Sequence, residues 1–250
     1  MLAGLQYQIL MHIAPRVPEN VCTGSAYRNR SKLETLLGAD LLNRLRGKTV
    51  VDFGCGEGLE AIELAGRGAA RVIGIDIRES CLQAARRNAA AAGVAERCTF
   101  ARYTEERADY IVSIDSFEHF RNPAGILGRM AKLLKPQGEV LAAFGPTWYH
   151  PLGGHLFSVF PWCHLMFSQE ALIRWRANFH SDGATRFTNT DGGLNRMTIR
   201  RFERLVAASP FELASLELAP IRRLRHLHNR LTREFTTAVV RCRLTTRIAP

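Results

Sequence analysis

The sequence lacks any apolar run long enough to cross a bilayer, although 46% of its 250 residues are hydrophobic. A membrane-spanning helix needs about 20 apolar residues in succession, so we expect none here. Cysteine is scarce as well, and the six that occur form no CxxC pair, which disfavours a disulfide framework and favours a reducing compartment. Residues 1–14 lack the basic segment and the small-residue cleavage site of a signal peptide. Together these absences predict a cytoplasmic protein.

Acidic residues are outnumbered: 23 Asp and Glu stand against 34 Lys and Arg, a formal net charge of +11. Such an excess attracts phosphates, nucleic acid or an anionic membrane surface. An Arg-rich solvated surface explains it equally well, because net charge does not specify a fold. Part of the excess lies in residues 221–235, where five arginines and two histidines stand among apolar residues. This stretch predicts a rough helical stripe that contacts anionic lipid or RNA phosphates, or else a solvated helix face.

Between residues 47 and 146, short apolar runs alternate with helical segments. The alternation predicts right-handed βαβ units and therefore an α/β fold with a doubly wound, mostly parallel sheet. Later in the chain a helix and two further apolar runs predict closing strands, as an antiparallel pair. Ser31 and Thr198 each stand at the start of a helical pattern, where Ser and Thr are preferred N-caps. The expected strands are 49–53, 71–77, 98–103, 109–114, 139–144, 211–219 and 236–244.

A glycine-rich turn joins the first expected strand to the next helix. Gly54, Gly56 and Gly58 follow the acidic residue Asp52 near the end of the strand. Such a turn lets the backbone approach a ligand closely and aims free N–H groups at it. The dinucleotide-binding fingerprint is GxGxxG, but Leu59 stands where its third glycine would fall. The GxGxG spacing therefore disfavours a dinucleotide.

The second expected strand is followed by an acid, Asp76, at its carboxyl end. Parallel α/β sheets bind ligands at that edge. A carboxylate there can accept both hydroxyls of a ribose, in charge-assisted hydrogen bonds that contribute about 1.5–3 kcal/mol each. The alternative is that Asp76 caps the following helix, a common position for Asp. The glycine loop upstream favours ribose binding, with Ile77 lying against the attached base.

These motifs resemble those of class I S-adenosylmethionine-dependent methyltransferases, and are similar to the ubiquinone-pathway O-methyltransferase and methyltransferase type 11 group. The GxGxG loop after an acid looks like the first family motif. Residues 108–113 resemble the fourth-strand motif, and residues 133–141 resemble the LLKPGG turn with the fifth strand. The likeness covers about residues 30–145. It implies a seven-stranded Rossmann-like sheet and an enzyme that uses S-adenosylmethionine as its cofactor.

The resemblance also implies which residues bind this cofactor. The family often places an acid after the third strand to bind the adenine amino group. Here residues 101–103 read Ala-Arg-Tyr, so no residue is predicted for that contact. The implied cofactor-binding residues are Asp52, Gly54, Cys55, Gly56, Gly58, Asp76, Ile77 and Asp115.

After the fourth expected strand, Asp115, Glu118 and His119 follow an i, i+3, i+4 spacing that puts them on one side of a helical turn. The segment resembles the ExxEH segment of the ubiquinone-pathway O-methyltransferases and the small-RNA 2′-O-methyltransferases, where it is linked to a divalent ion. His155 follows the fifth strand and is expected to complete the set. Carboxylate and imidazole ligands suit Mg²⁺, Mn²⁺, Fe²⁺ or Zn²⁺. Without a metal the segment packs and caps the next helix, and His119 or His150 is the catalytic general base.

Residues 147–196 break the alternating pattern and are rich in aromatic residues, histidine and glycine. They predict a lid that encloses a lipophilic or aromatic acceptor, a membrane-facing patch, or a second small core that buries its own aromatics. We therefore expect an N-terminal helical lead-in, a cofactor-binding Rossmann-like core, a lid insert, and a C-terminal helix with strands that complete the sheet. These segments are 1–46, 47–146, 147–196 and 197–250.

The leading functional hypothesis is methyl transfer to a small, aromatic or lipophilic acceptor, at an oxygen atom. The rivals are methylation of an RNA ribose 2′-hydroxyl and a non-catalytic S-adenosylmethionine-binding partner protein. The sequence contains no Asp/Asn-Pro-Pro-Tyr tetrad of base-amine methyltransferases and no Pro-Cys or Thr-Cys nucleophile at a strand end. A small-molecule or lipid-like acceptor is therefore favoured over nucleic acid, with peripheral contact to an anionic membrane as a further expectation. The sequence indicates no oligomeric state.

Overall fold

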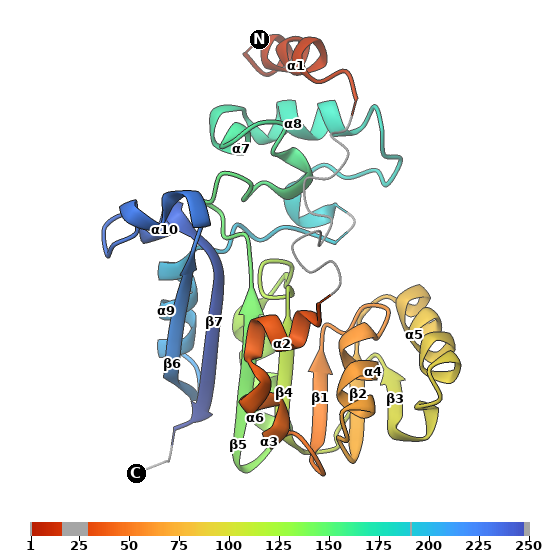
Figure 1. Ribbon diagram of the computed structural model, residues 1–250. Helices are drawn as coiled ribbons and strands as arrows, with labels where there is room; N and C mark the ends of the chain where they lie inside the picture. The colour runs from red at the N-terminus through yellow and green to blue at the C-terminus, as the bar shows by residue number, and fades with distance from the viewer. Residues whose placement is uncertain (1, 17–29, 191, 248–250) are drawn as a thin grey trace.

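The computed structural model of the protein describes residues 2–16, 30–190 and 192–247 (Figure 1). A seven-stranded sheet runs through it in the order β3-β2-β1-β4-β5-β7-β6. The first five strands are parallel, and β7 lies antiparallel between β5 and β6. The predicted doubly wound, mostly parallel α/β sheet is thus confirmed. Its strands are β1 (Thr49–Phe53), β2 (Arg71–Ile75), β3 (Cys98–Ala101), β4 (Ala108–Ile114), β5 (Leu134–Phe144), β6 (Phe211–Pro220) and β7 (Thr237–Thr246).

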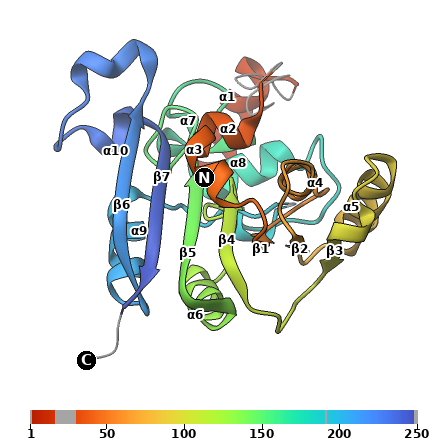
Figure 2. The same cartoon turned by 60° about the horizontal axis from the view of Figure 1, so that its bottom comes forward.

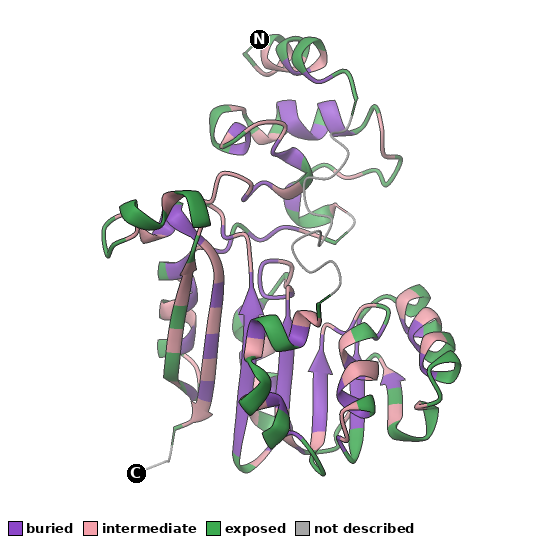
Figure 3. Ribbon diagram, in the orientation of Figure 1, coloured by how far each residue is buried: buried purple, intermediate pink, exposed green. Residues whose placement is uncertain are grey.

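Helices cover both faces of the sheet (Figure 2). On one face α6 and α9 bury apolar side chains against the strands, and on the other face α2, α3, α4 and α5 do so. The central strands are therefore buried from both sides (Figure 3), which explains why they read as continuous apolar runs. The bounds are α2 (Lys32–Leu37), α3 (Ala39–Arg44), α4 (Leu59–Gly66), α5 (Glu79–Ala91), α6 (Pro123–Leu133) and α9 (Ile199–Ala207), with the 3₁₀ turn η2 (Ala95–Arg97) before β3.

Two helices begin at the predicted capping residues. Ser31 Oγ accepts the backbone N–H of Glu34 at 2.9 Å at the start of α2. Thr198 Oγ1 accepts the backbone N–H of Arg201 at 3.1 Å at the start of α9. Each side chain satisfies an N–H group that the helix itself leaves without a partner. Both predicted N-caps are confirmed.

The described part of residues 147–196 and the N-terminal helix α1 (Leu2–Ile13) form a separate small core, which we call the cap. The cap lies beyond the carboxyl ends of the parallel strands (Figure 1). Phe157, Trp175 and Phe187 are buried inside it. Aromatic residues that suggested a substrate-enclosing lid thus pack on one another, as the alternative of a second small core predicted. Its further elements are η3 (His155–Phe157), α7 (Cys163–Met166), α8 (Gln169–Arg176) and η4 (Phe187–Asn189).

Residues 221–235 do not form the continuous helix that their pattern predicted. They fold as the 3₁₀ helix η5 (Arg222–Leu227), a turn, and the start of the short α10 (Arg233–Thr236). In the turn, Asn229 Oδ1 accepts the backbone N–H groups of Leu231 and Thr232 at 2.8 and 3.2 Å. A side chain that bonds its own backbone in this way competes with helix formation. Among the described helices, none has the length and apolar character needed to cross a membrane.

Candidate active site

The glycine loop joins β1 to α4 at the carboxyl edge of the sheet. Gly54, Gly56 and Gly58 have φ angles of 90°, 51° and 81°, which residues with a side chain rarely adopt. A Cβ on Gly54 would lie 2.9 Å from Ser116 Cβ, and one on Gly58 would lie 2.8 Å from Ala85 Cβ. Packing therefore requires glycine at both positions. A Cβ on Gly56 would meet only one side-chain atom, at 4.0 Å, so Gly56 is where a ligand has room to approach the backbone.

Asp76, which follows β2, is hydrogen-bonded to this loop. Its Oδ2 accepts the backbone N–H of Gly56 at 3.0 Å, and its Oδ1 accepts the backbone N–H of Arg78 at 2.8 Å. Arg78 itself is the N-cap residue of α5, so the capping alternative for Asp76 is wrong. The Nε of Arg78 also donates to Oδ1, at 3.3 Å. A carboxylate has about four acceptor sites, and these three bonds leave capacity for a ribose hydroxyl. Ile77 beside it is 77% exposed and offers an apolar surface that a base can cover.

Lys32 connects α2 to the cofactor loop, although its sequence context did not single it out. Its ammonium lies 2.8 Å from Asp115 Oδ2 and 3.0 Å from Glu60 Oε1. Burial opposes the charge on Lys32, but the two carboxylates outweigh burial and raise the pKa of Lys32 above its ordinary value. Asp115 follows β4 with a φ of 48°, and this ion pair helps to hold it. The edge of the sheet therefore presents an ammonium and a carboxylate side by side.

Asp52 lies buried at the end of β1, beneath the glycine loop. Its Oδ2 has no hydrogen-bond partner among the described residues. Burial, together with the nearby Glu60, raises the pKa of the Asp52 carboxyl well above its usual range. A buried acceptor of this kind is expected to find a partner in a water molecule or a ligand. Asp52 is thus available to a ligand or a water molecule beside the glycine loop.

The turn after β4 is anchored by Phe117. Its buried ring lies 5.2 Å from the ring of Phe202 and 5.6 Å from that of Phe144, measured between centroids. This packing fixes the turn to the sheet, so the next two residues, Glu118 and His119, are held at the carboxyl edge.

Glu118, His119 and His155 converge at this edge. One ligand atom from each lies within 4.8 Å of the other two. Glu118 Oε1 accepts the N–H of Gly145 at 3.1 Å, whereas the buried Oε2 has no partner among the described residues. His119 Nδ1 donates to the carbonyl of Gly193 at 2.7 Å. Because a carbonyl only accepts, this bond fixes the tautomer and leaves His119 Nε2 with a free lone pair.

His155 is arranged in the same way. One ring nitrogen is bonded to the carbonyl of Pro146, while Nε2 is buried without a partner among the described residues. Burial, with His119 close by, lowers the pKa of His155 to about 3. Burial, with Asp115 close by, raises the pKa of Glu118 to about 8. One carboxyl group and two imidazoles, each with a ring nitrogen that faces the cluster, form a ligand set that divalent metals use.

Two predicted site residues lie elsewhere. The expectation placed Asp115 among the metal ligands, but its carboxylate pairs with Lys32 and is absent from the cluster of converging ligand atoms. His150, the second candidate base, uses its Nδ1 to accept the N–H of Leu152 at 2.9 Å. His155 instead packs against His119, with ring centroids 5.1 Å apart.

Cys55 was implied in cofactor binding through its place in the loop. Its side chain is buried, and its sulfur would lie 2.9 Å from a Cβ added to Gly74 in β2. The thiol therefore faces the sheet, and only the backbone of Cys55 faces the loop.

The sequence is similar to those of known methyltransferases. A family model described as a methyltransferase domain matches residues 25–216. The chain is 41% identical over 103 residues to a ubiquinone biosynthesis O-methyltransferase from Neisseria meningitidis serogroup C, covering 38% of this chain and 43% of that protein. It is 39% identical over 109 residues to a ribosomal protein L11 methyltransferase from Aliivibrio fischeri, covering 43% and 36%. The chain thus spans less than half the length of these curated relatives.

Among solved structures, magnesium protoporphyrin IX methyltransferase from Synechocystis PCC 6803 has a similar fold. The TM-score is 0.54 at 16% identity, over 98% of this chain and 94% of that chain. This likeness concerns the fold alone, whereas the family model covers most of the chain, including the glycine loop and the Asp76 edge. The chain belongs to the family whose model is described as a methyltransferase domain.

Proposed function

We propose that this chain is a class I S-adenosylmethionine-dependent methyltransferase that acts on an oxygen of a small, aromatic or lipid-like acceptor. The observation that carries the proposal is the convergence of Glu118, His119 and His155 next to the cofactor loop. The turn that bears the first two adjoins the loop directly, since the Ser116 hydroxyl lies 3.4 Å from the carbonyl of Gly54. A proton acceptor at this place is what a hydroxyl nucleophile needs, because it must lose a proton as its oxygen attacks.

The described residues fit the donor. S-adenosylmethionine supplies an electrophilic methyl group on a sulfonium sulfur and carries a zwitterionic amino-acid end. Lys32 and Asp115 present the complementary pair of charges at 2.8 Å from one another. Asp76 has acceptor capacity for a ribose hydroxyl, and the exposed side chain of Ile77 offers a surface for adenine. We infer that these four residues bind the donor around the open face of Gly56.

When no metal ion is bound, His119 is the residue that we assign to proton removal. Its Nε2 lone pair is free because Nδ1–H donates to Gly193. A phenol has an ordinary pKa of about 10, so a neutral imidazole at the hydroxyl assists ionisation near neutral pH. His155 keeps a second imidazole lone pair in the same place.

The same three residues fit a divalent metal ion. Glu118 Oε2 and His155 Nε2 are buried acceptors without partners among the described residues. Each imidazole also bonds a backbone carbonyl through its other nitrogen, the arrangement that orients metal-binding histidines. Bound there, Mg²⁺, Mn²⁺, Fe²⁺ or Zn²⁺ would lower the pKa of an acceptor hydroxyl. We therefore propose Glu118, His119 and His155, without Asp115, as the ligands.

Transfer to oxygen is tested with small acceptors that differ only in the element that accepts the methyl group. Catechol, benzene-1,2-dithiol and 1,2-phenylenediamine are each incubated with the enzyme and isotope-labelled S-adenosylmethionine, and the products are separated by mass spectrometry. We expect label on the oxygen of catechol and little on sulfur or nitrogen. Preferred transfer to the amine, or transfer only to added RNA, would contradict the proposal.

The role of the three-residue cluster is tested separately. After removal of metals with a chelator, Mn²⁺ is titrated calorimetrically into the wild type, Glu118→Gln and the matched control Glu170→Gln, whose carboxyl group is on the exposed face of the cap. We expect saturable binding that Glu118→Gln loses and Glu170→Gln keeps. Equal binding by all three proteins would exclude the metal site, and full activity of Glu118→Gln in excess chelator would exclude both Glu118 and a metal ion from catalysis.

A further inference from the structure

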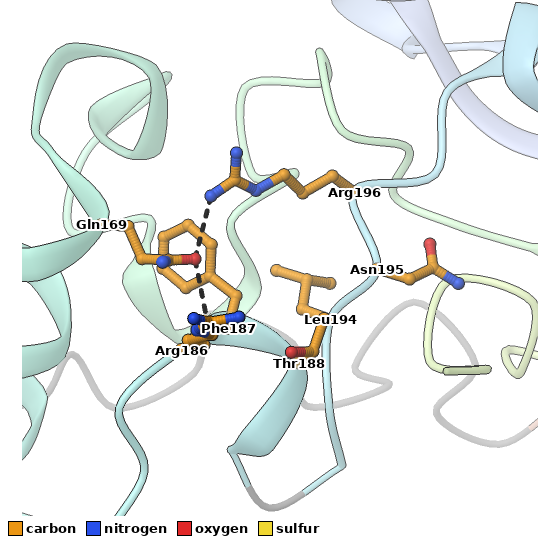
Figure 4. Close-up of a pocket in the computed structure, with 7 residues that line it drawn as sticks. All are labelled: Gln169, Arg186, Phe187, Thr188, Leu194, Asn195 and Arg196. Atoms are coloured by element: carbon orange, nitrogen blue, oxygen red, sulfur yellow. Dashed lines mark hydrogen bonds between the residues drawn. The ribbon is translucent and has the colours of Figure 1, made fainter. Parts of the chain in front are cut away.

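A cavity of about 410 Å³ lies in the cap (Figure 4). It is formed where α8, η4 and the segment that leads into α9 meet. Two of its lining residues are arginines, and no described residue that lines it is acidic. The lining residues are Gln169, Arg186, Phe187, Thr188, Leu194, Asn195 and Arg196.

Arg196 is held in this cavity by aromatic rings. Its backbone adopts a φ of 57°, which costs energy in a residue with a side chain. The guanidinium carbon lies 5.1 Å from the centroid of the Phe187 ring and 5.2 Å from that of Trp148. Its Nη2 donates to Gln169 Oε1 at 2.9 Å. Aromatic faces position a guanidinium and leave its positive charge without a counter-ion.

Gln169 and Arg186 supply further donors, whereas the buried Oδ1 of Asn195 is an acceptor without a partner among the described residues. Gln169 Oε1 also accepts the backbone N–H of Phe187 at 3.3 Å, so the side-chain amide nitrogen of Gln169 stays available to donate. Arg186 is exposed and forms no ion pair with a described residue. Phe187 and Leu194 add buried apolar surface. A cavity with two cations, an amide donor and an apolar wall suits an organic anion.

One wall of the cavity is hydrogen-bonded to the turn after β4, which carries Glu118 and His119. The backbone N–H of Asn195 donates to the carbonyl of Glu118 at 2.9 Å. The side-chain amide of Asn195 donates to the carbonyls of Phe117 and Phe120 at 2.6 and 2.8 Å, and Gly193 accepts from His119. The segment 193–195 therefore contacts Glu118 and His119 directly, while Leu194 and Asn195 also line the cavity.

We propose that this cavity binds an oxyanion group of the acceptor, a carboxylate or a phosphate, and so helps to select acceptors that carry one. The inference rests on the proposed function, because it places the acceptor beside Glu118 and His119. A planar guanidinium binds the oxygens of either group through two parallel hydrogen bonds. Arg186 and Arg196 supply the positive charge, and Gln169 supplies a further donor.

The test measures binding without turnover, so that it does not depend on which atom is methylated. In the presence of S-adenosylhomocysteine and at constant ionic strength, inorganic phosphate, benzoate and neutral benzamide are titrated into the protein by calorimetry. We expect phosphate and benzoate to bind saturably and benzamide to bind at least about tenfold more weakly, as loss of charge-assisted hydrogen bonds implies. Absence of saturable anion binding by the wild type, or equal binding of benzoate and benzamide, would overturn the proposal.

Substitutions of Arg186 and Arg196 test where on the protein the anion binds. Arg186→Gln removes a side chain with no ion pair to a described residue, so its fold is expected to be retained, and Arg196→Gln removes the ring-bound cation. Each should weaken benzoate binding on the order of tenfold. Arg174→Gln is the matched control, because Arg174 stacks on Tyr7 elsewhere in the cap, 4.2 Å from its ring centroid. Equal weakening by Arg174→Gln would show general attraction to a basic protein and would contradict a site at Arg186 and Arg196.

Discussion

The ammonium of Lys32 lies 2.8 Å from Asp115 Oδ2, and this ion pair links the start of helix α2 to the residue that follows β4. The same ammonium reaches Glu60 Oε1 at 3.0 Å, in the first turn of the helix after the glycine loop. A lysine in the first turn of a helix opposes the helix dipole. The carboxylates of Asp115 and Glu60 compensate for this unfavourable position, because each forms an ion pair with Lys32.

Lys32→Gln is expected to weaken S-adenosylhomocysteine binding by about tenfold or more. The reason is that the carboxylate at the amino-acid end of the ligand loses its ion pair with the Lys32 ammonium. Binding of 5′-methylthioadenosine, which has no amino-acid end, should stay unchanged. Calorimetry with both ligands checks this, with Lys132→Gln on the exposed side of α6 as the control. Equal weakening of both ligands would mean that Lys32 only supports the fold.

Gly58→Ala is expected to lower the free energy of unfolding by at least about 2 kcal/mol, through a positive φ and overpacking. The added Cβ would lie 2.8 Å from Ala85 Cβ at a φ of 81°. Gly128→Ala in α6 is the matched control, because a Cβ there meets nothing within 4 Å. In that helix interior the same substitution should stabilise by about 0.5–1 kcal/mol. Urea denaturation of both variants measures the two opposite signs.

The sheet could be predicted from the sequence because each strand is a local pattern. The apolar run of residues 49–53, the glycine turn and Asp76 follow one another within a short stretch, and together they specify a βαβ unit. Glu118 and His119 were predictable for the same reason, since they directly follow a strand. The capping hydroxyls of Ser31 and Thr198 were predictable because they bond within their own helices.

The remaining contacts depend on residues far apart in the chain. Lys32 reaches Asp115 only after the sheet has formed, so no local pattern indicates the pair. Both His150 and His155 follow β5, and it is the bond from His155 to Pro146 that brings its ring to the cluster. The aromatic density of residues 147–196 predicted a lid, a membrane-facing patch or a second small core. The structure shows the small core, in which the Trp175 ring N–H donates to the carbonyl of Ala14 at 2.8 Å, and no local pattern indicates that residues 2–14 take part in it.

The stability of the cap is expected to decrease in acid because His164 is buried and His150 is half-buried. Loss of solvent lowers the pKa of His150 to about 4 and also lowers the pKa of His164. His150 is therefore neutral in the folded protein near pH 6, whereas histidines of the unfolded chain bind protons below their ordinary pKa of about 6.5. Stability is therefore fully present above about pH 6.5 and is lost as the pH falls toward 4.

Urea denaturation at pH 7, 6 and 5 measures this loss, and His150→Gln should reduce it by an amount on the order of 1 kcal/mol between pH 7 and 5. His226 is exposed on η5, so His226→Gln is the control and should leave the pH dependence unchanged. If His150→Gln shows the same pH dependence as the wild type, His150 does not contribute to it.

Glu234→Ala is expected to lower the free energy of unfolding by about 1–3 kcal/mol, because the Glu234 side chain caps the first turn of the neighbouring helix α9. Glu234 is buried in α10, and its two carboxylate oxygens accept the backbone N–H groups of Ile199 and Arg200 at 3.0 and 2.9 Å, at the start of α9. Glu217→Ala on β6 removes an exposed carboxylate that pairs with Arg241 at 3.1 Å, and it should cost less than about 1 kcal/mol. Amide hydrogen exchange locates the effect: faster exchange confined to the first turn of α9 in Glu234→Ala supports the cap, whereas uniform acceleration in both variants contradicts it.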